Sequence, residues 1–189
     1  VAGGGNTIDA SGGSYPFIGA GQYNTNTSND GVIVGGCCNC LFENSNSIIC
    51  ASHLLNKEGV VSGEIVGGNL SVIYSLIGSP SDLETDNKIL FLEDLDEYLY
   101  HIDRMMISLK RSGKLSNLKA LIIGSMTKMN DNIIPFGKTA NEIILEHTNS
   151  YNYPVISNFP AGHINNNLSI ILGKESHLKI DNNNVTLLQ

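Results

Sequence analysis

The sequence contains no tryptophan, no cluster of basic residues and no apolar run longer than five residues. A membrane-spanning helix needs about 20 predominantly apolar residues, so these short runs argue against a membrane span. A net charge of −7 without a basic stripe argues against nucleic acid as a partner. The N-terminus has neither a basic start nor the apolar core of a signal peptide. The chain starts at Val1, and the missing initiator methionine predicts a fragment. We therefore expect a soluble globular protein, with 41% apolar residues to form its core.

Most of the chain also lacks cysteine, because all four cysteines lie within fourteen residues, at Cys37, Cys38, Cys40 and Cys50. Four cysteines allow three disulfide pairings, but this spacing lacks the paired C-x-x-C of common zinc sites. Buried free thiols that pack as small apolar residues are the expected state. We therefore expect no metal and no cofactor.

Residues 1–56 have no lysine or arginine, although they contain ten of the twenty glycines and eight asparagines. From Lys57 onward the composition is that of a conventional mixed domain. The break near Asn56 predicts two parts, a Gly/Asn-rich segment at 1–56 and an α/β domain at 57–189. An artificial join between unrelated sequences would produce the same break.

A short pattern recurs in the first segment, as GGGN ending at Asn6, IGAGQYN ending at Asn24 and IVGGCCN ending at Asn39. A small apolar strand, a glycine turn and a recurring asparagine at intervals of 15 to 18 residues are typical of a parallel β-coil. The segment resembles the β-roll head repeats of trimeric adhesins and fibres, which implies a trimer. The alternative is a low-complexity segment that is partly disordered.

The second part alternates apolar strands with amphipathic helices, which predicts a mixed α/β fold. A turn is expected at Gly67-Gly68, and Asn69 is expected to cap the helix that follows. The expected strands span 60–66, 89–92, 120–124, 155–157, 169–173 and 177–188, and the expected helices span 69–76, 95–109 and 136–149.

The strand at 89–92 ends abruptly on Glu93 and Asp94, and an amphipathic helix follows. A strand that delivers a carboxylate to a cleft is a common way to position a catalytic acid. The same two acids would also stabilise the positive N-terminus of the helix without any chemical role. The pattern alone leaves both interpretations open.

Among the five histidines, His163 alone follows a rigid Pro-Ala-Gly loop. A histidine held by such a loop, with a carboxylate on its second nitrogen, is the base half of a nucleophilic triad. No serine has the expected setting on a tight turn between strand and helix. The candidates considered were Ser71, Ser79, Ser125 and Ser157.

Three stretches, GEIVGGNLSVIYSLIGS, KILFLEDLDEYLYHIDRMMISLKRSGKL and FPAGHINNNLSIILG, resemble the C-terminal half of the serine LD-carboxypeptidases. The resemblance covers about residues 55–189. It implies a β/β/α C-terminal domain, with Glu93 and His163 as two members of a Ser-His-Glu triad and Gly67, Gly68 and Asn69 beside the substrate. It also implies a cytoplasmic, metal-independent enzyme, often a homodimer, that acts on murein tetrapeptides.

The nucleophilic serine of that family lies in an N-terminal lobe that residues 1–56 do not resemble. Loss of a triad nucleophile removes several orders of magnitude in rate. We therefore expect the chain alone to be inactive as a peptidase. The rival interpretation is a structural or binding protein in which a trimeric β-roll carries a passenger peptidase lobe.

Overall fold

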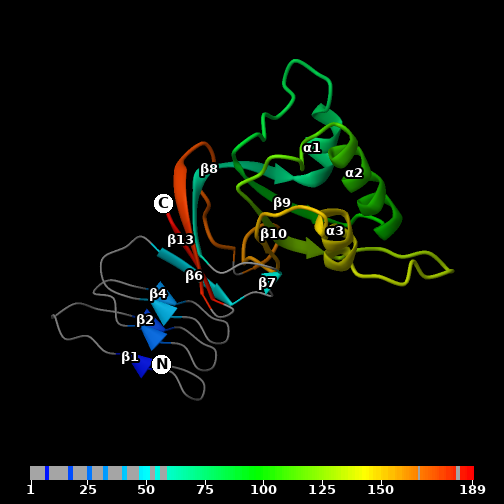
Figure 1. Ribbon diagram of the computed structural model, residues 1–189. Coiled ribbons are helices and arrows are strands. Elements are labelled where there is room, and N and C mark those ends of the chain that lie inside the picture. Colours follow the sequence, from blue (N-terminus) through cyan, green and yellow to red (C-terminus); the bar gives the residue numbers. More distant parts are fainter. Residues whose placement is uncertain are drawn as a thin grey trace.

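The computed structural model describes residues 59–189 except 166, 182 and 183, together with the backbone of seven short strands before residue 59 (Figure 1). The central feature is an eight-stranded sheet with the order β6-β13-β12-β8-β9-β10-β11-β7. Strands β8 to β11 are parallel to one another, whereas β12, β13, β6 and β7 pair antiparallel. The strands are β6 (Ser47–Ala51), β7 (Leu54–Leu55), β8 (Gly59–Asn69), β9 (Ile89–Leu95), β10 (Ala120–Thr127), β11 (Val155–Ile156), β12 (Glu175–Asp181) and β13 (Asn184–Leu188).

The long strand β8 joins the two halves of the sheet. Its first part, from Gly59 to Glu64, pairs with β12, and its second part, from Ile65 to Asn69, pairs with β9. The strand therefore passes from an antiparallel ribbon into a parallel sheet, which gives the sheet its curled form (Figure 1). The carboxyl end of β8 consequently lies beside the carboxyl end of β9.

Successive side chains of β9 point alternately to the two faces of the sheet. Leu90 and Leu92 pack in the cluster formed with the helices, whereas Ile89 and Phe91 pack in a second cluster on the opposite face. Because successive residues of a strand point to opposite faces, Glu93 continues the second face. This alternation separates the acid of the candidate site from its neighbour Asp94.

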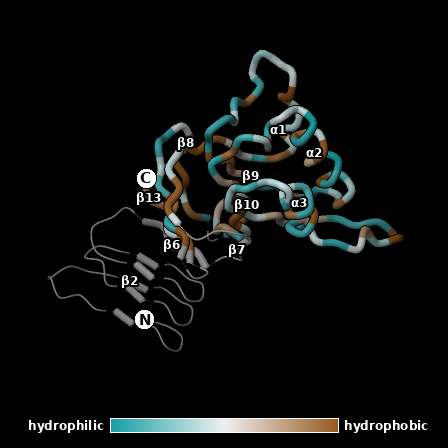
Figure 2. The backbone as a smooth tube through the Cα atoms, in the orientation of Figure 1, coloured by the Kyte–Doolittle hydropathy of each residue, from teal (hydrophilic) through white to brown (hydrophobic). Residues whose placement is uncertain are grey.

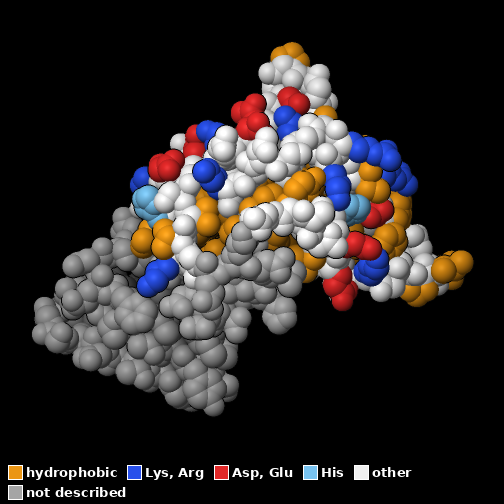
Figure 3. Space-filling view, viewed as in Figure 1, with side chains coloured by type: hydrophobic (Ala, Val, Ile, Leu, Met, Phe, Trp, Pro, Cys, Tyr) orange, Lys and Arg blue, Asp and Glu red, His pale blue; other side chains and the backbone are white. Residues whose placement is uncertain are grey.

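Three helices, α1 (Leu70–Leu76), α2 (Leu99–Arg111) and α3 (Ala140–Thr148), cover one face of the parallel strands (Figure 1). Helix α2 contributes the fully buried side chains of Ile102, Met105, Met106 and Leu109. Figure 2 shows apolar residues along the central strands and polar residues on the outer turns. Acidic and basic side chains are interspersed over the face in Figure 3.

Several expected boundaries were wrong. Gly67 and Gly68 continue β8 with φ angles of +135° and +142°, because glycine tolerates these values while the strand stays paired with β9. Leu95 ends β9, and α2 begins only at Leu99. The last helix begins at Ala140, where a capping box between Thr139 and Glu142 satisfies its first turn. No strand forms at 169–173. The cap at Asn69 is confirmed, since its side chain accepts a hydrogen bond from Val72 N.

Five further strands pair in parallel: β1 (Thr7–Ile8) with β3 (Thr25–Asn26), β3 with β5 (Cys40–Leu41), and β2 (Phe17–Ile18) with β4 (Val32–Ile33). The repeated asparagines at 6, 24 and 39, together with Cys37 and Cys38, lie outside the described residues, as do the side chains of Cys40 and Cys50. Strands β6 and β7, from the segment expected to be separate, pair with β13 and β11.

Candidate functional site

A carboxylate and an imidazole meet at the carboxyl end of β9. Glu93 Oε2 lies 2.7 Å from His163 Nδ1, and the backbone N–H of His163 donates to the same oxygen at 3.3 Å. The two residues are 70 positions apart in sequence, and the fold brings together the pair that the sequence predicted. The other ring nitrogen, Nε2, has no partner among the described residues and is available to a substrate or a nucleophile.

The loop before His163 approaches the carboxylate closely because residue 162 is glycine. A Cβ added to Gly162, whose φ is +117°, would lie 2.8 Å from Glu93 Oε2 and 2.4 Å from Ser125 Oγ. The Gly162 N–H donates to Asn167 Oδ1 at 2.8 Å, which fixes the loop from its other side. A side chain at this position would push His163 away from Glu93.

A hollow of about 560 Å³ opens beside this pair. Glu93 is buried at its edge, whereas half of the His163 side chain, 51%, is exposed. A buried carboxylate behind an accessible imidazole is the arrangement that general-base catalysis requires. The lining residues are Gly68, Phe91, Glu93, Ala161, Gly162, His163, Asn167, Leu168, Ser169, Ile170 and Leu172.

The carboxylate also sets the proton affinity of the histidine. The hydrogen bond to Glu93, reinforced by its negative charge and by that of Asp94, raises the pKa of His163 above its usual value of about 6.5. A higher pKa makes the neutral imidazole a stronger base. The Glu93 contact at Nδ1 also leaves Nε2 as the atom that accepts a proton.

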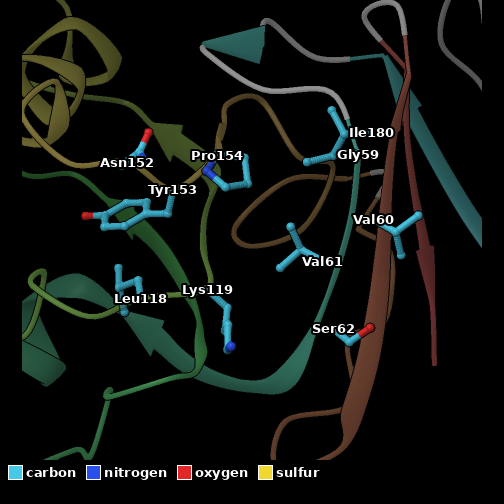
Figure 4. Close-up of a pocket in the computed structure, with 10 residues that line it drawn as sticks. All are labelled: Gly59, Val60, Val61, Ser62, Leu118, Lys119, Asn152, Tyr153, Pro154 and Ile180. Atoms are coloured by element: carbon cyan, nitrogen blue, oxygen red, sulfur yellow. The ribbon is translucent and has the colours of Figure 1, made fainter.

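A second hollow, of about 550 Å³, lies near the start of β8 (Figure 4). Val60 and Val61 of β8, Lys119 before β10 and Tyr153 before β11 contribute to its walls. Its lining, as far as the structure describes it, contains no histidine and no carboxylate. The first hollow is therefore the candidate active site.

The three residues predicted beside the substrate have different surroundings. Gly68 lines the hollow. Gly67 lies against the backbone of β9, where an added Cβ would be 1.9 Å from Phe91 O. Asn69 caps α1 and donates its side-chain amide to Asp94 Oδ1 at 2.8 Å. Only Gly68 is thus in contact with the hollow itself.

Asp94 anchors the start of α1 on the helix face of the sheet. Asn69 Nδ2 and Leu95 N donate to its Oδ1, and Ser71 N and Oγ donate to its Oδ2. The carboxylate is 2% exposed and accepts four hydrogen bonds. These contacts are structural, but they support the start of α1, whereas the second interpretation of the acidic pair expected support for the helix that follows it, α2.

The same network continues to a second glutamate and histidine pair. Burial of Glu97 would raise its pKa, but hydrogen bonds from Ser71 and His101 outweigh burial and lower the pKa. Sequence reasoning missed this network. The signal available was a run of four acids within five positions, from Glu93 to Glu97, which sequence alone could not connect to Ser71.

None of the four candidate serines has a hydrogen bond with His163. Ser71 Oγ is engaged by Asp94 and Glu97, and Ser79 Oγ accepts from Ser81 N. Ser157 is buried, and Ser125 Oγ is buried on the Glu93 side of the pair. Among the described hydrogen bonds of Ser71, Ser79 and Ser125, none reaches His163.

No group of three or more histidine, cysteine, aspartate or glutamate side chains among the described residues is arranged to hold a metal ion. No helix in the described part is long and apolar enough to cross a bilayer.

Comparison with known proteins gives a consistent result. Residues 62–178 match the LD-carboxypeptidase C-terminal domain family. A probable murein peptide carboxypeptidase of Bacillus subtilis is 31% identical over 122 residues, covering 62% of this chain and 37% of the relative. A putative carboxypeptidase of Rickettsia conorii is 31% identical over 143 residues, covering 70% of this chain and 42% of the relative.

Among solved structures, muramoyltetrapeptide carboxypeptidase from Oxalobacter formigenes superimposes with a TM-score of 0.67 at 26% identity. The match covers 76% of this chain and 49% of that protein. The chain therefore spans less than half the length of each of these three relatives.

Proposed function

Because the chain belongs to the LD-carboxypeptidase C-terminal domain family, we propose that residues 57–189 form the C-terminal lobe of a serine LD-carboxypeptidase. The complete enzyme removes the terminal D-amino acid from an L,D-linked murein tetrapeptide during peptidoglycan recycling. The observation that carries this proposal is the 2.7 Å contact between Glu93 Oε2 and His163 Nδ1 beside an open hollow. The names of the relatives support the substrate class.

In this proposal His163 is the general base and Glu93 orients it. A serine from the N-terminal lobe gives its proton to His163 Nε2 and attacks the scissile carbonyl carbon. The imidazolium then gives that proton to the leaving amine, and water repeats the sequence to release the acyl group. Glu93 stays ionised and stabilises the imidazolium throughout.

The substrate side is formed by Gly68 directly and by Gly67 and Asn69 through the shape of β8 and α1. The exposed apolar side chain of Leu172 lines the same hollow. The enzyme uses no metal or other cofactor, acts in the cytoplasm and assembles as a homodimer. The division of the chain at residue 56 also remains a prediction.

This proposal predicts that the chain alone releases no D-alanine from an L,D-linked tetrapeptide. Addition of a separately produced N-terminal lobe from a family member is expected to restore release, because the lobe supplies the serine that His163 lacks. Mass spectrometry of the released D-alanine measures both reactions.

The control for this experiment is a pair of histidine variants. His163→Ala should reduce release by the mixture to the level of the added lobe alone, whereas His177→Ala, in β12 and bonded to Ser62, should leave it intact. Release by the chain alone that is lost in His163→Ala would mean that one of its own serines is the nucleophile. Release by the mixture that is insensitive to His163→Ala would refute the assignment of the base.

A second candidate function is supported by the strands before residue 42. Thr7 pairs in parallel with Thr25, Thr25 with Cys40, and Phe17 with Val32, at intervals of 15 to 18 residues. Such short parallel pairs at a regular interval are what a β-roll requires. We propose a β-roll at residues 1–56 that trimerises and holds the peptidase lobe.

The trimer is testable in solution. Light scattering of the purified chain at micromolar concentration should give three times the mass of one chain. Removal of residues up to 46, which keeps β6 in the sheet, should abolish the trimer. A monomer or dimer of the whole chain would contradict the β-roll assembly, and a dimer would favour the family's arrangement.

A further inference from the structure

The hydroxyl of Ser125 is buried next to the Glu93 carboxylate without a hydrogen-bond partner among the described residues. Buried hydroxyl groups are rarely left unpaired, so such a group calls for an explanation. Ser125 does not contact His163 and cannot act as its nucleophile from the Glu93 side. A role other than nucleophile must therefore explain why this hydroxyl is buried beside Glu93.

Strand pairing brings Ser125 to this position. Strand β10 is in register with β9 up to Ile123 opposite Leu92, and the register shifts before Met126 pairs with Asp94. Ser125 lies within this irregularity, and its N–H donates to Ala161 O at 2.9 Å. Irregularities of this kind redirect a side chain, and they are frequent next to active sites.

Ser125 Oγ and a carboxylate oxygen of Glu93 both lie close to Gly162. Ser125 Oγ and Glu93 Oε2 lie 2.4 and 2.8 Å from the point where a Cβ of Gly162 would stand. Both described hydrogen bonds of Glu93 fall on Oε2, which leaves its second oxygen, Oε1, able to accept a further donor.

We infer that Ser125 is a positioning residue whose hydroxyl donates to the Glu93 carboxylate through one bridging water, and so holds that carboxylate against His163. A second donor to the carboxylate, besides His163, restrains its rotation. The Glu93 and His163 contact then persists while the imidazole gains and loses its proton. This inference rests on the proposed function, because it deepens the account of the same site.

NMR of the ring proton on His163 Nδ1 tests the inference without a substrate, in the chain labelled with ¹⁵N. A proton held by a carboxylate is shifted downfield and protected from exchange with water. In Ser125→Ala we expect its exchange rate to rise about tenfold, since a charge-assisted hydrogen bond weakens when its acceptor is free to rotate. Ser169→Ala, in the lining of the same hollow, should leave the rate unchanged.

The His147 ring proton, held by Asp103 at 2.7 Å, is an internal reference for folding in every spectrum. If Ser125→Ala loses that reference signal, Ser125→Cys replaces it, because a thiol fills the space but donates weakly, and about a threefold rise is expected. An unchanged rate in the folded variant would overturn the inference, as would an equal rise in Ser169→Ala or a wild-type protein without the protected proton. Failure of peptide hydrolysis by the mixture with an added N-terminal lobe would refute the proposed function but leave this measurement intact.

Discussion

Glu93→Gln is expected to lower kcat/KM of the enzyme completed with an N-terminal lobe by about 10⁴, with the fold retained. The variant keeps the size of the side chain and exchanges one carboxylate oxygen for an amide. The loss is this large because the change acts on the imidazole in two ways, through its tautomer and through its charge.

The tautomer follows from the contact at Nδ1. Ionised Glu93 can only accept, so it selects the imidazole with its hydrogen on Nδ1 and its lone pair on Nε2. An amide can turn its NH₂ group towards Nδ1, which places the hydrogen on Nε2 and removes the base. The amide also lacks the charge that stabilises the imidazolium formed during attack.

The measurement is kcat/KM for D-alanine release, with Asp103→Asn as the matched control. Asp103 of α2 also pairs with a histidine, His147 of α3, at 2.7 Å. Neither residue lines the hollow. The control should retain most of the activity. A loss below tenfold in Glu93→Gln would show that His163 acts without an orienting carboxylate.

A pH titration of Glu93→Gln tests the contact with His163 independently of activity, through the direction in which the pKa of His163 changes. The pKa of His163 is raised in the folded chain, so its contribution to stability is present below pH ~6.5 and is lost as the pH rises through the folded pKa. Glu93→Gln should return the pKa of His163 towards 6.5 and remove this slope. The His163 pKa, followed by NMR, should therefore fall in the variant and not in Asp103→Asn.

Local patterns in the sequence singled out Glu93 and His163 as candidates, but the resemblance to the LD-carboxypeptidases was needed to pair them as acid and base. The apolar run from Ile89 ends on Glu93, and a Pro-Ala-Gly turn precedes His163. Each residue is therefore marked by a motif only a few positions long. Period-two alternation along β9 even assigns Glu93 and Asp94 to opposite faces. The asparagine cap at residue 69 has a similarly local cause.

Features that depend on distant pairing could not be predicted in this way. The helix expected from Leu95 starts later because β9 continues beside β10, and Asp96 takes a φ of +62° after it. Ser125 was examined only as a nucleophile, because its approach to Glu93 depends on a register shift between two strands. The pairing of β7 with β11 joins residues about 100 positions apart, for which no local signal exists.

Gly67→Ala is expected to lower the free energy of unfolding by about 4 kcal/mol or more, a large share of the roughly 5–15 kcal/mol that a typical domain has. The new Cβ would lie 1.9 Å from Phe91 O, which is backbone of the central strand and cannot rotate aside. The φ of +135° adds strain of its own for any residue with a side chain. Either β8 or β9 would have to move, and their pairing brings Asn69 beside Glu93.

A matched variant at the adjacent Gly68 distinguishes the steric clash of a new Cβ from the backbone strain of a positive φ. Gly68 has a nearly equal φ of +142°, but an added Cβ there meets nothing within 4 Å. Gly68→Ala should therefore cost only the backbone strain, about 1–3 kcal/mol. Urea unfolding followed by circular dichroism compares the two midpoints, with the slopes checked for two-state behaviour. Equal losses in the two variants would mean that β9 moves to accommodate the new methyl group, so that the close approach of Gly67 to Phe91 O is not a rigid constraint.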